Sequence, residues 1–148
     1  MALELVLNDI ILRLTIAAIF GALVGLEREL RGVSAGLKTH ALVCLGAALF
    51  TIVSIQFSIL DERVDIARIA AGVVTGIGFL GAGAIFFDKK SIHGLTTAAN
   101  IWAVAALGLI IGVGQYEIAF VAAVIIYIIL IFGALLEKKL IKKSGRKR

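Results

Sequence analysis

Long apolar stretches separated by short polar segments make up most of this 148-residue chain. Five such stretches extend over residues 10–26, 41–60, 66–87, 95–113 and 118–136. Each is roughly 17–22 residues long, the length that an α-helix needs to cross a hydrocarbon core about 30 Å thick. The segments between them are short, so neighbouring helices are expected to be antiparallel. The pattern predicts an all-α polytopic membrane protein, with a bundle of five transmembrane helices in residues 1–137 and a basic tail at 138–148.

The composition agrees with a membrane location. Hydrophobic residues make up 61% of the chain, the mean hydropathy is +1.08, and there is no proline. An ordinary globular domain is only about 45–50% apolar. The net charge of +5 does not indicate a nucleic-acid partner, because seven of the fifteen Lys and Arg residues lie in the last eleven positions. A basic tail beside a membrane helix is typical of the cytoplasmic side, where it contacts anionic lipid.

The distribution of basic residues predicts the orientation. With the N-terminus outside, the inner segments hold twelve Lys and Arg residues and the outer segments hold three. The positive-inside rule then favours an outer N-terminus and a cytoplasmic C-terminus. The start of the chain shows neither a charged n-region nor a cleavage site, so no removable signal peptide is expected.

Glycines are concentrated in the third apolar stretch. Small residues let membrane helices approach closely, so we expect tight helix packing here, either within one protomer or between protomers. The alternative is that crowded glycines permit a kink or expose carbonyl groups to a cavity. The same four-residue spacing recurs at Gly21–Gly25 and Gly108–Gly112. The glycines of the third stretch are Gly72, Gly76, Gly78, Gly81 and Gly83.

Three polar residues, Thr96, Thr97 and Asn100, lie near the inner end of the fourth stretch. Thr96 and Asn100 are spaced i, i+4 and are expected to share a helix face. Such groups usually hydrogen-bond to a neighbouring helix. A ligand or partner site on this face is the second hypothesis.

Charged and titratable residues gather at the inner interface in the predicted topology. Taken singly, each is expected to be solvated or to face lipid headgroups. Taken together, they could line an inner vestibule, because three loops bring them to one surface. They are Glu27, Arg28, Lys38, His40 and His93.

At the outer interface, Arg68 stands one turn inside the third stretch. It is expected to extend toward the headgroups and to pair with Asp65 or Asp61.

Catalytic chemistry is not indicated. The sequence shows no zinc-ligand spacing, nucleotide loop or Ser/His/Asp arrangement, and no Asp or Glu lies deep within an apolar stretch. Mg²⁺ prefers carboxylate and water oxygens, so a dehydrating magnesium site at the midplane has little support. We expect no enzyme activity, cofactor or bound metal. Cys44, the single cysteine, is interpreted as a small core residue, with a reactive thiol as the alternative.

Four sequence blocks, in order, resemble the membrane domain of the MgtC/SapB family. The resemblance extends over most of residues 10–115. Lys38 and His93 stand where members often carry arginine. The blocks are Gly25-Leu26-Glu27-Arg28, residues 35–43 (AGLKTHALV), residues 76–83 (GIGFLGAG), and residues 94–99 (GLTTAA) with Trp102 and residues 105–108 (AALG).

The resemblance implies an inner-membrane protein linked to magnesium limitation and, in pathogens, to survival inside host cells. Members are often described as magnesium transporters, but the family is also similar to regulators of other membrane proteins, including the proton-translocating ATP synthase. We therefore expect a regulator that acts through a membrane-protein partner. The glycine-rich face predicts in addition that the protein is homo-oligomeric. The alternative is a transporter of Mg²⁺ or another small solute along the surface of Thr96, Thr97 and Asn100.

Overall fold

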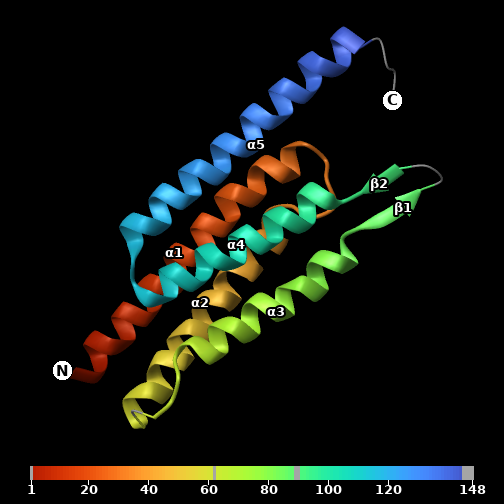
Figure 1. Ribbon diagram of the computed structural model, residues 1–148. Coiled ribbons are helices and arrows are strands. Elements are labelled where there is room, and N and C mark those ends of the chain that lie inside the picture. The colour runs from red at the N-terminus through yellow and green to blue at the C-terminus, as the bar shows by residue number, and fades with distance from the viewer. Residues whose placement is uncertain (1, 62, 89–90, 145–148) are drawn as a thin grey trace.

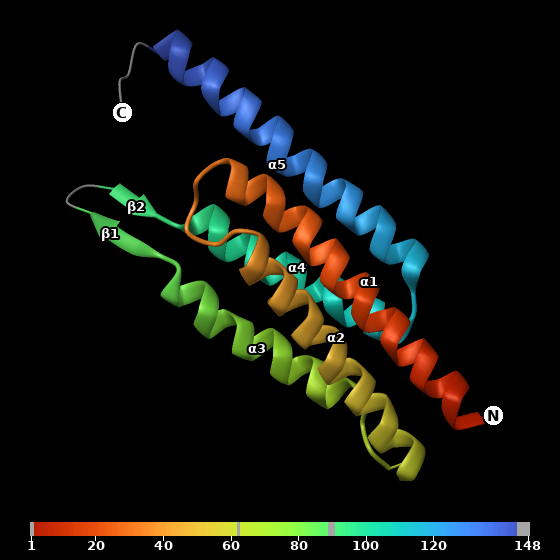
Figure 2. The ribbon, with the colours of Figure 1, turned by 180° about the vertical axis from the view of Figure 1, so that it is seen from behind.

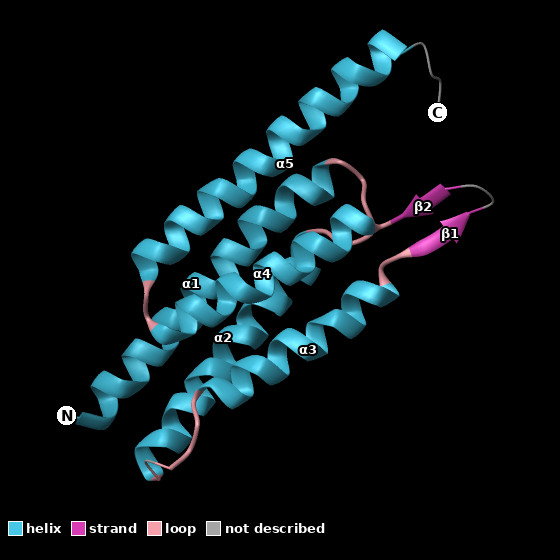
Figure 3. Cartoon of the chain, in the orientation of Figure 1, coloured by secondary structure: helices cyan, strands magenta, loops and turns pink. Residues whose placement is uncertain are grey.

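Five helices and one β-hairpin form the structure, a computed structural model that describes residues 2–61, 63–88 and 91–144. Helices α1 (Ala2–Leu30) and α2 (Leu37–Leu60) are followed by α3 (Ala67–Gly83). The hairpin strands β1 (Phe86–Asp88) and β2 (Ser91–His93) lead to α4 (Leu95–Val113) and α5 (Tyr116–Ser144). Figure 3 shows that helix dominates the chain and that the short hairpin extends from one end of the helices. The all-α expectation is confirmed.

Helix α2 packs between α1 and α4, and its contacts with these two helices are the most extensive between helices of the described chain (Figures 1 and 2). Helix α5 lies along one side of this group and α3 along the opposite side (Figure 1). The core contains Cys44 and Ala48 of α2 with Val104, Leu107 and Ile111 of α4, all of them buried. Cys44 is therefore a core residue, as the sequence indicated.

Glycine pairs on α1 and α4 allow this close packing. A Cβ atom added at Gly21 would lie 2.7 Å from Cys44 Cβ, and one at Gly25 would lie 2.7 Å from Leu37 Cα. On α4, a Cβ atom at Gly112 would lie 2.6 Å from Thr51 Cβ, and one at Gly108 would collide with the Cys44 carbonyl oxygen. Both helices therefore contact the α2 backbone through their glycines, which is the use predicted for this spacing.

The glycines of α3 do not make such close contacts within the described chain. Within the described chain, no atom lies within 4 Å of a Cβ atom added at Gly72, Gly76, Gly78 or Gly83. A Cβ atom at Gly81 would only touch Ala98, at an ordinary 3.6 Å. The prediction of tight packing within one protomer is therefore wrong for Gly72, Gly76, Gly78 and Gly83. Packing between protomers stays a prediction.

The number of membrane spans is supported only in part. Among the described residues, four helices are long and apolar enough to cross a membrane: α1, α2, α4 and α5. The third apolar stretch forms a helix of only 17 residues, and Phe86 and Phe87 belong to a strand instead. A membrane bundle is thus supported, whereas a fifth span remains a prediction. At the C-terminus, α5 continues into the expected basic tail as far as Ser144.

Candidate functional site

Polar side chains from three helices meet inside one end of the bundle, which we call the hairpin end. At this end α1, α3 and α5 finish, α2 and α4 begin, and the hairpin projects (Figure 1). The buried polar residues here are Glu27, Arg28, His40, Thr97 and Asn100. We refer to these five residues as the polar cluster.

His40 connects α2 to α4. Its Nδ1–H group donates to the Gly36 carbonyl oxygen at 2.8 Å, and Nε2 is 2.9 Å from the Asn100 side-chain amide nitrogen. With Nδ1 protonated, Nε2 is free to accept the hydrogen bond from Asn100, so both ring nitrogens of a neutral imidazole are satisfied. Gly25 allows this arrangement, because a Cβ atom there would lie 2.9 Å from His40 Cβ.

Arg28 connects α1 to α4. Its Nη2 atom donates to Thr97 Oγ1 at 3.2 Å, and the residue is only 6% exposed. Thr97 and Asn100 are spaced i, i+3, so one face of α4 receives both the arginine of α1 and the histidine of α2. The cluster therefore joins all three helices of the core through side-chain hydrogen bonds.

Glu27 and Arg31 extend the cluster toward α5. Glu27 is buried and forms an ion pair with Arg31, whose Nη2 atom also donates to the Leu130 carbonyl oxygen of α5 at 3.2 Å. Arg31 was not among the predicted site residues. Its i, i+4 spacing from Glu27 is the signal that would have indicated the pair. Within the described chain, Glu27 Oε2 and Arg28 Nε have no hydrogen-bond partner.

The structure divides the residues that the sequence placed on the inner surface. Glu27, Arg28 and His40 join the polar cluster, whereas Lys38 and His93 are exposed. His93 stacks on Phe86 and lies 2.7 Å from Ser91 Oγ. The five residues therefore do not form one cluster, and a vestibule lined by all of them stays a prediction.

The predicted polar face of α4 is only partly buried. Thr97 and Asn100 are buried, whereas Thr96 is exposed. Around the helix, Thr96 lies about 40° from Asn100 and about 100° from Thr97, so it stands at the exposed edge of this face.

The predicted pair of Asp65 with Arg68 is not formed. The Asp65 carboxylate instead accepts a hydrogen bond from the Ala67 backbone N–H at 2.9 Å. The ion pair in this loop joins Arg63 Nη2 to Asp61 Oδ2 at 2.8 Å. The side-chain and backbone hydrogen bonds from Arg63 lower the pKa of the Asp61 carboxyl below its ordinary value.

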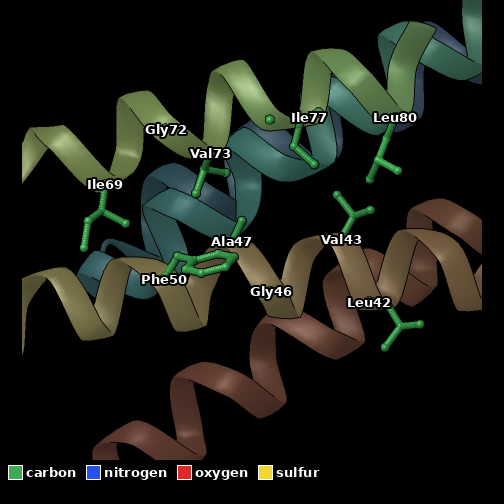
Figure 4. Close-up of a pocket in the computed structure, with 11 residues that line it drawn as sticks. Leu42, Val43, Gly46, Ala47, Phe50, Ile69, Gly72, Val73, Ile77 and Leu80 are labelled. Carbon is green, nitrogen blue, oxygen red and sulfur yellow. The ribbon is translucent and has the colours of Figure 1, made fainter. Parts of the chain in front are cut away.

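A separate feature is an apolar groove between α2 and α3, with a volume of about 670 Å³. Val73 and Ile77 of α3 point across it toward α2, where Val43 and Phe50 lie (Figure 4). Gly46, Gly72 and Gly76 also line it. Because the lining residues are glycine or apolar, the groove suits hydrocarbon or another apolar helix.

The described residues contain no cluster of three or more His, Cys, Asp and Glu side chains that could hold a metal ion. What the polar cluster does chemically is to join helices. Its hydrogen bonds join α4 to α1 through Arg28 and to α2 through His40.

Comparison with known proteins places the chain among magnesium-related membrane proteins. It matches the MgtC family over residues 14–139. It is 46% identical over 128 residues to the Escherichia coli K12 protein named "Putative magnesium transporter YhiD", which covers 82% of this chain and 59% of that protein. It is 47% identical over 116 residues to the protein MgtC of Salmonella typhimurium strain LT2, which covers 78% and 48% of the two chains.

An uncharacterized protein of Haemophilus influenzae is 41% identical over 143 residues, covering 92% of this chain and 60% of its own. The chain thus spans between 48% and 60% of the length of these relatives. No solved structure matches the chain.

Proposed function

Because the chain belongs to the MgtC family, we propose that it is a cytoplasmic-membrane regulator of the response to magnesium limitation. It acts without catalysis, by contact with another membrane protein. The proton-translocating ATP synthase, which the family resemblance suggests, is the first partner to test. The proposed orientation places the N-terminus outside and the hairpin end, with its polar cluster and basic residues, in the cytoplasm.

One observation carries the choice of a regulator: the two buried polar side chains of α4, Thr97 and Asn100, are engaged by other helices of the bundle. Asn100 is engaged by His40, and Thr97 is engaged by Arg28. A hydrated dication needs either carboxylate ligands or a polar channel wide enough to keep its water shell. The open groove is apolar, and such a surface suits a transmembrane helix of a partner.

Transport of Mg²⁺ is the second candidate, because the Escherichia coli relative is named for it. In that case a path would have to open beside Glu27 and Arg28, where Glu27 Oε2 and Arg28 Nε are buried without a hydrogen-bond partner in the described chain. The two proposals make opposite predictions for purified protein in vesicles.

The test combines flux with growth. Proteoliposomes containing a magnesium-sensitive dye should show no more Mg²⁺ uptake than empty vesicles. In a bacterial strain lacking its own copy, the wild-type protein should support growth in low magnesium. Gly76→Leu, which fills the groove, should abolish that support. Gly83→Leu is the matched control, since Gly83 lies on the same helix, has equal space around it and does not line the groove.

Two results would overturn the regulator. Protein-dependent Mg²⁺ uptake would favour the transporter. Equal growth with Gly76→Leu and Gly83→Leu would remove the groove from the mechanism. Both variants must first be shown to reach the membrane in normal amount.

A further inference from the structure

The two faces of the β-hairpin differ in chemistry. Phe87 pairs with Ile92 across the strands, and these two side chains share one face. They are 80% and 50% exposed. The other face carries Phe86 stacked on His93, with Ser91 bonded to the same imidazole ring. The hairpin is therefore amphipathic, with one face entirely apolar.

Its base has a fixed geometry. Gly94, which joins β2 to α4, adopts a left-handed conformation with φ of 86°. A Cβ atom there would collide with the Ala84 carbonyl oxygen and lie 3.2 Å from Ile85 Cα. The chain entering the hairpin thus touches the chain leaving it. The hairpin faces have a set direction relative to the ends of α3 and α4.

The position of the hairpin identifies what covers the apolar face. The membrane span of α4 begins at Leu95, three residues after Ile92, a distance of at most about 10 Å. Helix α3 ends at Gly83, three residues before Phe86. The hairpin therefore lies close to the boundary between acyl chains and headgroups, where amphipathic segments bury their apolar face to a depth of about 5–10 Å.

The charge at this end agrees with a lipid surface. Lys38 is exposed in the first turn of α2, and the Arg31 side chain is 32% exposed at the end of α1. Basic residues close to the bilayer surface attract anionic lipid headgroups. The helices that adjoin the hairpin also carry exposed apolar residues near it in sequence, Leu80 on α3 and Leu95 on α4.

We propose that the hairpin is an interfacial lipid anchor. Phe87 and Ile92 insert at the headgroup–acyl boundary of the adjacent leaflet, while the Phe86 and His93 face stays toward water. The hairpin then fixes the depth of the α3–α4 connection in the bilayer. This inference concerns the lipid surface and does not depend on the regulatory role proposed above.

The experiment places a tryptophan on each face in turn. Trp102 is first replaced by phenylalanine, and Phe87→Trp or Phe86→Trp is then introduced as a matched pair. The proteins are reconstituted in phosphatidylcholine vesicles, with or without phosphatidylglycerol, whose acyl chains are brominated near the headgroup. The Phe87→Trp variant should emit at shorter wavelength and be quenched at least about twofold more than the Phe86→Trp variant. Phosphatidylglycerol should increase the quenching.

Each other result counts against the anchor. Absence of quenching at both positions would mean that the hairpin projects into water. Equal quenching at both positions would contradict the assignment of the Phe87 and Ile92 face to the lipid. Emission at position 87 that changes with protein density but not with brominated lipid would mean that a second protein copy covers it. If tryptophan prevents folding, nitroxide labels on Phe87→Cys and Phe86→Cys in a Cys44→Ala background give the same comparison by depth measurement.

Discussion

Replacing Gly108 and Gly76 by alanine in separate variants should have opposite effects on stability, although each glycine belongs to a pair with the same four-residue spacing. At either position, alanine has a helix propensity about 1 kcal/mol more favourable than that of glycine. At Gly76 the new methyl group meets no atom within 4 Å in the described chain, so the gain is retained. At Gly108 it collides with the Cys44 carbonyl oxygen and lies 2.8 Å from Ala47 Cβ.

The magnitude follows from the cost of separating α2 and α4. Overpacking a well-packed site by one methyl group costs about 1–3 kcal/mol, and a backbone carbonyl cannot rotate away as a flexible side chain can. After the propensity gain, Gly108→Ala should lower the free energy of unfolding by up to about 2 kcal/mol, while Gly76→Ala should leave it equal or higher.

Reversible unfolding in mixed micelles, followed by circular dichroism during titration with a denaturing detergent, measures both variants. If Gly108→Ala is as stable as Gly76→Ala, then α4 does not contact α2 as closely as described, and the argument from glycine packing fails. An oligomer formed through α3 would instead appear as a loss of oligomer in Gly76→Ala without loss of helix content.

Three further predictions concern other parts of the chain. Asn100→Leu should lower the free energy of unfolding by about 1–3 kcal/mol, because it leaves the buried His40 acceptor without a donor; detergent-denaturation curves measure the loss. Because Arg63 lowers the folded-state pKa of Asp61, their interaction is present above the ordinary carboxyl pKa and is lost as pH falls through the lowered value. NMR titration should show the Asp61 pKa returning toward its ordinary value in Arg63→Ala. In a Cys44→Ala background, Arg63→Cys should react with an impermeant label from outside and Lys139→Cys only after permeabilisation; the reverse pattern would contradict the orientation.

Hydropathy predicts the helices, because a single apolar segment that crosses a membrane has few conformations other than a helix. The fourth stretch, 95–113, coincides with α4, and the second differs from α2 only by four residues at its start. Helix α1 was underestimated. It continues to Leu30, beyond the expected end at residue 26, so Glu27 and Arg28 lie within a helix rather than in a solvated loop.

The spacing of residues in the sequence does not predict which face of each helix is buried. The pattern of Gly72 and Gly76 is the same as that of Gly108 and Gly112, yet only the second pair faces another helix of the chain. Likewise, Thr96 and Thr97 are adjacent and chemically identical, but only Thr97 reaches the arginine of α1. In an almost uniformly apolar helix the hydrophobic pattern does not distinguish the core from the lipid, so the buried face is decided by tertiary contacts.

The unequal attachment of α3 connects these observations to function. One end of α3 is held by the Ser54 hydroxyl, which donates to the Ile66 carbonyl oxygen at 2.8 Å, and the other by the contact of Gly81 with Ala98. Between these points the groove separates α3 from α2. A helix with few buried contacts opens at lower free energy than the core does. Since α1, α2 and α4 are joined by both glycine packing and the polar cluster, a partner that occupies the groove would displace α3 first.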